Sequence, residues 1–186
     1  LWSRRTWILN SKIHQMTAFL TELFDEMQVE TVFVGKNKNW KQDLPFGKFV
    51  NQRFAHLPYE TFIDQLHYKC RLRGIVVTTQ EESYTSKASF LDNDDIPIYG
   101  EVENPTFSGR RIKRGLYRAS DGRLINADVN GSYNIMKKGL MTNHQFLHID
   151  SPMIKPLVVK GVGQEPNKNL VQLYVTLNVC EGLGVP

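Results

Sequence analysis

The sequence predicts a mixed α/β fold, and three observations support this prediction. Residues 30–35 and 75–79 are two short runs rich in β-branched residues, typical of buried strands. A helical pattern lies between them, so strand, helix and strand form a βαβ unit with parallel neighbouring strands. The first segment is an amphipathic helix whose apolar residues recur every three or four positions: Leu9, Ile13, Met16, Leu20, Leu23 and Met27.

The helix between the two strands has clear start and stop signals. Pro58 opens it and Gly74 follows its end, the usual places for these two residues. One side is apolar and carries Tyr59, Phe62, Ile63, Leu66 and Cys70. The polar residues 36–57 form a long loop before it, and a loop of this length is usually functional.

The second half of the chain is predicted to be less regular. Residues 83–110 combine Pro, Gly and acidic residues, which indicates irregular structure. RRIKRGLYR and RLINA flank the turn sequence ASDG and predict a β-hairpin. A short helix follows with Val129, Tyr133 and Met136 on one side, and Gly139 is expected at its end. Residues 141–186 contain β-rich runs that pattern alone does not assign.

Composition restricts the function classes. The chain has 186 residues, 41% of them hydrophobic, and no apolar run long enough to span a membrane. Its start lacks an initiating Met, so we expect it to begin inside a longer protein. Two cysteines, Cys70 and Cys180, cannot form a zinc knuckle or a disulfide framework, which fits a reducing compartment.

The net charge of +4 is concentrated in one stretch. Six basic residues lie close together there: Arg110, Arg111, Lys113, Arg114, Arg118 and Arg123. Such a cluster favours a polyanionic partner, and a solvated hairpin face is the alternative. Lys36, Asn37, Trp40, Lys41 and Gln42 follow the first strand end, where ligands gather in α/β sheets. Lys41 is placed to contact a phosphate and Trp40 to stack on a base, or Trp40 packs on the domain edge.

Carboxylates stand where extended runs end. Glu81 and Glu82 follow the run at 75–79, and Asp128 separates an apolar run from a helical pattern. Hard oxygen ligands at strand ends suit Mg²⁺, as a nuclease requires. Adjacent residues on a strand point to opposite faces, so only one of the two glutamates is expected at a shared site; we favour Glu82, nearer the strand end. Asp128 as a helix cap and the glutamates as a solvated pair remain the alternatives.

Several of these segments resemble one family. VFVGKNKNWKQ, EESYTSKASFLD, GRRIKRGLYRASDGRLINADVNGSYNI and the first helix with His14 resemble the C-terminal half of the TnpB (OrfB-type) proteins of bacterial insertion sequences, relatives of the type V CRISPR effectors. The resemblance covers about residues 1–138. It implies a partial RNase H-like (RuvC-like) domain over 1–140, with a zinc-ribbon insertion at about 83–127 and a tail at 141–186.

The resemblance also implies a function. It predicts an RNA-guided DNA endonuclease that uses an Asp, a Glu and a final Asp with Mg²⁺, with DNA and guide RNA as partners. It places the protein in the bacterial cytoplasm, at the nucleoid, with no membrane association. It assigns the final Asp to Asp128, and Asp128 with Glu82 (or Glu81) would be the metal ligands in this chain.

Three departures from the family pattern are expected to matter. The first catalytic Asp and the guide-binding domain correspond to segments upstream of residue 1. Many members carry the Glu on the strand at 30–35, which here ends in Val34 and Gly35, so Glu81 or Glu82 would replace it. The ribbon lacks zinc ligands: Ala88 stands where cysteine is frequent, and LYRASDG replaces the second knuckle. A metal-free, degenerate ribbon is therefore expected.

These departures leave three interpretations open. The chain is the C-terminal part of an endonuclease that is inactive by itself, a nuclease-inactive relative that still binds RNA or DNA, or a truncated transposase remnant. Loss of one carboxylate reduces catalysis far more than binding. The gene sequence upstream of residue 1 would distinguish the three.

Overall fold

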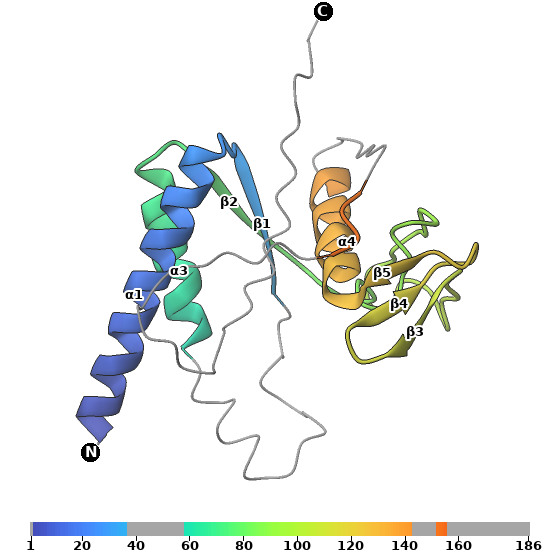
Figure 1. The fold of residues 1–186 in the computed structure, drawn as a ribbon, viewed down its shortest axis with the longest axis horizontal. Helices are drawn as coiled ribbons and strands as arrows, with labels where there is room; N and C mark the ends of the chain where they lie inside the picture. The colour runs from blue at the N-terminus through green and yellow to red at the C-terminus, as the bar shows by residue number, and fades with distance from the viewer. Residues whose placement is uncertain (1, 37–57, 143–151, 156–186) are drawn as a thin grey trace, which may run out of the picture.

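The computed structural model describes residues 2–36, 58–142 and 152–155. A parallel pair of strands forms its centre, with helices on both sides, and a small antiparallel sheet lies beyond one helix (Figure 1). The elements in chain order are α1 (Trp2–Glu26), β1 (Thr31–Gly35), α3 (Tyr59–Arg71), β2 (Val76–Gln80), β3 (Arg110–Lys113), β4 (Leu116–Arg118), β5 (Leu124–Asn126) and α4 (Ala127–Thr142). The predicted α/β class is confirmed.

The predicted βαβ unit is confirmed. β1 and β2 are parallel and pair from Thr31 opposite Val76 to Gly35 opposite Gln80. α3 connects them across one face, and Gly74 follows α3 with a positive φ of 75°. The Gly74 N–H donates to the Arg71 carbonyl and the Ile75 N–H to the Cys70 carbonyl, a Schellman ending that requires a residue such as glycine at this position.

α1 and α3 cover one face of the strand pair and bury its main apolar core. Leu20 and Phe24 of α1 meet Leu66 of α3 over Ile75 and Val77. Polar residues also enter this contact, since Thr17 and Thr21 are buried on α1. Their hydroxyls donate to the carbonyls four residues earlier, at 2.8 and 2.7 Å, so burial leaves no unmet hydrogen bond.

α4 covers the opposite face and approaches β1 very closely. A methyl group added at Gly139 would lie 2.3 Å from a ring carbon of Phe33. The sequence prediction that Gly139 ends this helix is wrong, because α4 continues to Thr142. Glycine is present at this position because any larger residue would push the helix away from the sheet.

The predicted hairpin around ASDG is confirmed, because β4 and β5 pair across this turn, and β3 extends it to a three-stranded antiparallel sheet in the order β3-β4-β5. The sequence RRIKRGLYR is not one strand: it turns at Arg114 and Gly115, and Arg110 pairs with Arg118. Gly115 has a φ of 75°, which a residue with a side chain rarely adopts. Tyr117 and Ile125 of this sheet pack with Val129 and Tyr133 of α4 in a second core.

Residues 83–109 contain no strand or helix, as predicted, and side chains of α4 hold this segment. Two buried lysines of α4 point at it. Lys137 Nζ donates to the carbonyls of Asn93 and Asp94, at 3.1 and 2.7 Å. Lys138 Nζ donates to the carbonyls of Ser83 and Pro97, both at 3.3 Å. Backbone carbonyls thus receive hydrogen bonds that a regular element would otherwise supply.

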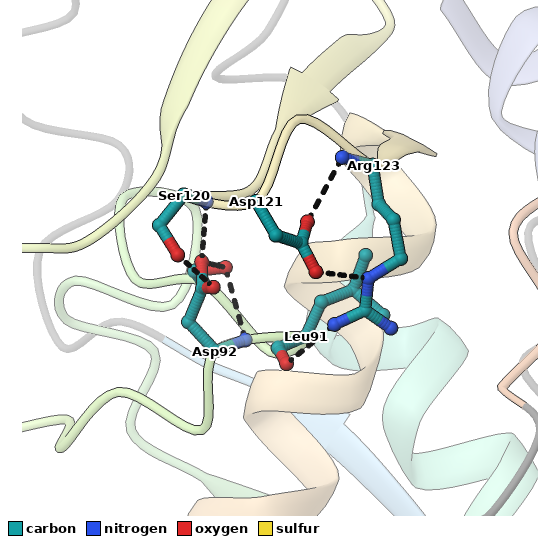
Figure 2. A network of polar contacts seen from close by, with 6 residues as sticks. Leu91, Asp92, Ser120, Asp121 and Arg123 are labelled. Carbon is teal, nitrogen blue, oxygen red and sulfur yellow. Dashed lines mark hydrogen bonds and ion pairs between the residues drawn. The ribbon is translucent and has the colours of Figure 1, made fainter.

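A carboxylate network joins the turn at residues 89–93 to the turn at residues 119–123 (Figure 2). Asp92 accepts hydrogen bonds from the hydroxyls of Ser89 and Ser120, both at 2.5 Å, and from the Ser120 N–H at 3.0 Å. Arg123 forms an ion pair with Asp121 at 2.5 Å and donates to the Leu91 carbonyl at 3.2 Å. Ser120 and Arg123 of one turn thus donate hydrogen bonds to Asp92 and Leu91 of the other.

Residues 152–155 lie against this same region. The Met153 N–H donates to the Tyr133 hydroxyl at 2.8 Å, and the Asn126 N–H donates to the Ile154 carbonyl at 2.9 Å. Sequence patterns left this part of 141–186 unassigned. Among the helices that the structure describes, none combines the length and apolar character needed to cross a membrane.

Two glycines on α4 provide a matched stability test of its packing. Gly139→Ala should destabilise the protein by about 1–3 kcal/mol, because the new methyl group overlaps the Phe33 ring. Gly131→Ala should instead stabilise it by about 0.5–1 kcal/mol, since nothing lies within 4 Å of the added carbon and alanine favours a helix. Urea unfolding of both variants measures the difference. Equal effects would show that α4 is not in close contact with β1.

The Asp92 network should make stability sensitive to acid. Burial opposes ionisation, but hydrogen bonds from Ser120 and Ser89 outweigh it and lower the pKa of Asp92. A lowered pKa stabilises the fold above the unfolded value of about 3.9, and this contribution is lost as pH falls through the folded value. Asp92→Asn should therefore cost about 1–3 kcal/mol at pH 7 and progressively less below about pH 4. Chemical denaturation across pH 3–7 measures this.

The control for this experiment is Asp64→Asn, an exposed carboxylate on α3, which should cost little at any pH. A constant difference between wild type and Asp92→Asn across the pH range would contradict the role of the Asp92 charge. Elemental analysis of the same samples tests the expectation of a zinc-free ribbon; about one zinc per chain would contradict it.

Candidate functional site

The C-terminal end of β2 brings Glu82 to the end of β1. Phe33 and Gly35 of β1 face α4, and Gln80 is the register partner of Gly35. Two residues beyond Gln80, Glu82 extends along this face. A methyl group added at Gly35 would lie 2.5 Å from Glu82 Oε2 and 2.8 Å from Ile135 on α4. The Glu82 carboxylate therefore occupies the space that a side chain at position 35 would fill.

The environment of Glu82 is unusual for a carboxylate. Burial, and then the neighbouring charge of Glu81, raise the pKa of Glu82. Within the described part of the chain, this carboxylate has no hydrogen bond and no cationic partner. Tyr59 lies near Glu82, and its hydroxyl donates to the Gly35 carbonyl at 2.6 Å. Burial, and then the negative charge of Glu82, raise the pKa of the Tyr59 hydroxyl. The Glu82 side chain is thus held in a partly desolvated position, close to the Tyr59 hydroxyl and to the negative charge of Glu81.

Glu81 is engaged differently. Its Oε2 lies 2.5 Å from the ammonium of Lys138, a side chain only 6% exposed, and its Oε1 accepts the Ser83 N–H at 2.7 Å. This carboxylate neutralises a buried lysine and holds the start of the insertion. The geometry therefore favours Glu82 as the glutamate that is available to a ligand.

Asp128 stands in the first turn of α4 with an exposed side chain. It does not cap the helix, because Asn126 Oδ1 accepts the N–H groups of Asp128 and Val129, at 2.9 and 3.1 Å. Asp128 and Ile135 are seven residues apart, so they share one face of α4 at an axial separation of about 10 Å. Ile135 packs beside Gly35 and Glu82, which places Asp128 on the helix face that leads to Glu82.

Two asparagines of the same helix have structural contacts. Asn130 accepts the Phe90 N–H at 3.0 Å and donates to the Ala88 carbonyl at 2.8 Å. Asn134 donates to the carbonyls of Thr85 and Ala88, each at 2.8 Å. Both side chains are fully buried. They fasten the insertion to α4, while Asn134 Oδ1 has no hydrogen-bond partner among the described residues.

The basic residues divide into free and engaged groups. Arg110, Arg111, Lys113 and Arg114 are all exposed along β3 and its turn, and Arg118 on β4 is half-buried. Two other basic residues have acidic partners: Arg123 pairs with Asp121, and Lys36 pairs with Glu60 at 2.8 Å. The predicted positions Asn37, Trp40 and Lys41 lie outside the described residues.

The sequence did not indicate two residues that contact the candidate site. Lys138 was not singled out, although a lysine pair inside a partly apolar helix is a signal for buried ammonium groups. Tyr59 was taken only as part of the apolar side of α3. Within the described ranges, no group of three or more His, Cys, Asp or Glu residues is arranged to hold a metal ion. Glu82 and Asp128 alone would thus be an incomplete ligand set.

Comparisons with known proteins agree with this architecture. Residues 59–135 match the family described as Cas12f1-like, TNB domain. The fold is similar to that of a Cas12f1 in the cryo-EM structure of a Cas12f1-sgRNA-target DNA complex, with a TM-score of 0.51 and 16% identity. That similarity covers 74% of this chain and 36% of the Cas12f1 chain, so the chain spans about a third of it. No curated protein matches the chain.

The matched segment runs from the start of α3 to the middle of α4, so it contains β2, the insertion, the antiparallel sheet and both candidate carboxylates. Residues 59–135 are thus similar to the Cas12f1-like TNB domain family, and the described fold is similar to that of a Cas12f1.

Proposed function

We propose that this chain carries part of the RNase H-like (RuvC-like) domain of a transposon-associated, RNA-guided DNA endonuclease of the bacterial nucleoid. In the intact protein this domain would hydrolyse phosphodiesters with Mg²⁺, and DNA and a guide RNA would be the partners. The observation that carries the proposal is the Glu82 carboxylate, unpaired within the described residues and half-buried at the carboxyl end of a parallel strand pair. Ligands of α/β sheets bind at this edge.

The two candidate carboxylates suit Mg²⁺ in their chemistry. Glu82 and Asp128 offer hard oxygen atoms, and both belong to the face between the sheet end and α4. A bound Mg²⁺ would stabilise charge on the reacting phosphate oxygens and help to activate water. Burial raises the pKa of Glu82, so a cation would relieve the cost of keeping this carboxylate ionised. A further carboxylate from outside the described residues would complete the ligand set.

Gly35 explains how a glutamate just beyond β2 can reach this position. Where family members carry the glutamate on the strand equivalent to β1, its carboxylate would reach the site from that strand. In this chain the missing side chain at Gly35 leaves that space to Glu82, which reaches it from the neighbouring strand. The carboxylate would then serve the same site from a different position in the sequence.

A nucleic-acid-binding relative without cleavage is the second candidate. It is supported by the exposed basic residues on β3, which are independent of the carboxylates. The two candidates differ in whether Glu82 and Asp128 bind a divalent cation.

Metal binding at Glu82 provides the direct test. Mn²⁺ should broaden the backbone amide signals of Gly35 and Asp128 in NMR spectra, because it would bind between their elements. Glu82→Gln and Asp128→Asn should each weaken this binding by roughly tenfold or more. Glu81→Gln is the matched control and should have little effect on Mn²⁺, since Glu81 pairs with Lys138. Equal broadening in wild type and Glu82→Gln would favour the binding-only relative.

The exposed basic residues of the antiparallel sheet test nucleic-acid binding. Reversing Arg111, Lys113 and Arg114 to Glu should weaken binding similarly for two unrelated single strands, because phosphate contacts carry little sequence information. The slope of affinity against salt should flatten by about one unit for each phosphate interaction that the variant removes. Fluorescence anisotropy across a salt titration measures both quantities.

The control for the charge change is the triple reversal of Arg4, Lys12 and Arg71, which are exposed on α1 and α3. If both triple variants changed the affinity and the salt slope equally, net charge alone would account for binding. The antiparallel sheet would then be a solvated face.

A further inference from the structure

The position of the Glu82 carboxylate depends on the backbone that carries it. Its oxygen atoms accept no hydrogen bond within the described part of the chain. The side chain is held by packing alone, in the space beside Gly35 and Ile135. A carboxylate without partners of its own moves whenever its backbone moves. The groups that fix the backbone of Glu82 therefore also fix the candidate ligand.

A tight turn holds this backbone. The Glu82 carbonyl accepts two hydrogen bonds from Thr85, one from Oγ1 at 2.9 Å and one from the N–H at 3.3 Å. Thr85 is buried, so water competes little for its hydroxyl. The hydroxyl of Thr85 thus supplies the shorter of the two contacts that close the turn directly after the candidate ligand.

The turn contains a strained residue. Tyr84, between Glu82 and Thr85, has a φ of 61°, in the left-handed region that residues with side chains rarely adopt. A glycine would take this conformation at little cost. Strained backbone persists where the surrounding structure enforces it, and it is concentrated at functional sites. The strain at Tyr84 therefore indicates that the position of this turn matters beyond stability.

α4 enforces the turn from a distant part of the sequence. Asn134 Nδ2 donates to the Thr85 carbonyl at 2.8 Å and to the Ala88 carbonyl at 2.8 Å. Thr85 is thus bonded to Glu82 through its hydroxyl and to α4 through its carbonyl. We call these two linked contacts, Asn134 to Thr85 and Thr85 to Glu82, the Thr85 tether.

The Thr85 tether has a cost at Asn134. This side chain is fully buried, and its Oδ1 has no hydrogen-bond partner among the described residues. A buried acceptor without a partner destabilises a fold, so each such atom requires an explanation. The amide is oriented with both N–H groups towards the insertion, and its own oxygen is left unpaired. Its orientation thus serves the carbonyls of Thr85 and Ala88.

The helix that holds the Thr85 tether also carries the second candidate ligand. Asp128 precedes Asn134 on α4 by six residues, and Ile135 packs beside Gly35 and the Glu82 carboxylate. Figure 1 shows α4 between the strand pair and the antiparallel sheet. A helix is a rigid element, and ligands of one site must be held to within about 0.5 Å. The tether therefore fixes Glu82 relative to Asp128.

We propose that Thr85 and Asn134 are positioning residues of the proposed metal site. Through the Thr85 tether they would hold Glu82 where it can share one divalent cation with Asp128, and neither would touch the cation. Groups that orient a ligand in this way commonly affect metal affinity as strongly as many ligands do. This inference rests on the proposed function and adds the residues that organise its ligands.

Two substitutions at Thr85 separate the hydroxyl from the packing. Thr85→Val keeps the branched shape and loses the hydroxyl, whereas Thr85→Ser keeps the hydroxyl and loses a methyl group. The dissociation constant of Mn²⁺ from the full chain should rise by roughly tenfold in Thr85→Val. It should stay close to the wild-type value in Thr85→Ser, because the contact with the Glu82 carbonyl is retained. Electron paramagnetic resonance of free Mn²⁺ measures these constants.

Thr21→Val is the matched control. Thr21 is a buried threonine of α1 whose hydroxyl also donates to a backbone carbonyl, that of Thr17, at 2.7 Å. The substitution removes the same kind of contact away from the candidate site, so Mn²⁺ affinity should remain that of wild type. Asn134 is less suited to substitution, because an apolar residue there would leave two backbone carbonyls without their donor.

A double-variant cycle tests whether Thr85 acts through Glu82. In a chain that already carries Glu82→Gln, adding Thr85→Val should cause no further loss of Mn²⁺ affinity, because the ligand that the Thr85 tether positions has been removed. A further tenfold loss would show that Thr85 acts independently of Glu82 and would overturn the inference. Equal losses in Thr85→Val and Thr85→Ser, or in Thr85→Val and Thr21→Val, would also overturn it, because general destabilisation would explain both.

The outcomes separate this inference from the proposed function. If Glu82→Gln weakens Mn²⁺ binding while Thr85→Val does not, the positioning role is wrong and the proposed metal site stands. If wild type does not bind Mn²⁺, or Glu82→Gln binds it as tightly as wild type, both are wrong. Loss in Thr85→Val, recovery in Thr85→Ser and no further loss in the Glu82→Gln chain together support the positioning role.

Discussion

The close approach of α4 to β1 is the constraint on which the rest of the described structure depends. It is possible only because Gly35 and Gly139 have no side chains at the two contact points, where Glu82, Ile135 and the Phe33 ring take up the space. A wider separation would move α4 away from the sheet and leave its buried polar residues exposed to water. The two glycines therefore fix the position of the helix that carries Asp128, and of every group that this helix holds.

α4 is in turn the template for an insertion without regular structure. Four of its side chains, Asn130, Asn134, Lys137 and Lys138, are buried and donate to backbone carbonyls of residues 83–97. Burying two ammonium groups is costly unless hydrogen bonds and charge compensate for it. Glu81 supplies the charge for Lys138, which explains why one glutamate of the pair is used for stability and the other is left available.

Local patterns in the sequence predicted the main strands and helices, whereas neighbours that are distant in the sequence decided the rest. Gly139 was misinterpreted because glycine can end a helix or allow a close helix–sheet contact, and the difference depends on Phe33, more than one hundred residues away. Alternation along β2 showed that Glu81 and Glu82 separate, but not which one is free, because the buried partner Lys138 lies 57 residues beyond Glu81.

The proposed metal-binding carboxylate and the proposed nucleic-acid surface on β3 carry opposite charges. Glu82 would repel a phosphate, because no cation neutralises it within the described residues, whereas the residues of β3 would attract one. A strand bound only through β3 would therefore stay away from the carboxylate. A divalent cation at Glu82 would then reverse the repulsion, so in the proposed function the metal would determine whether a bound strand reaches the carboxylates.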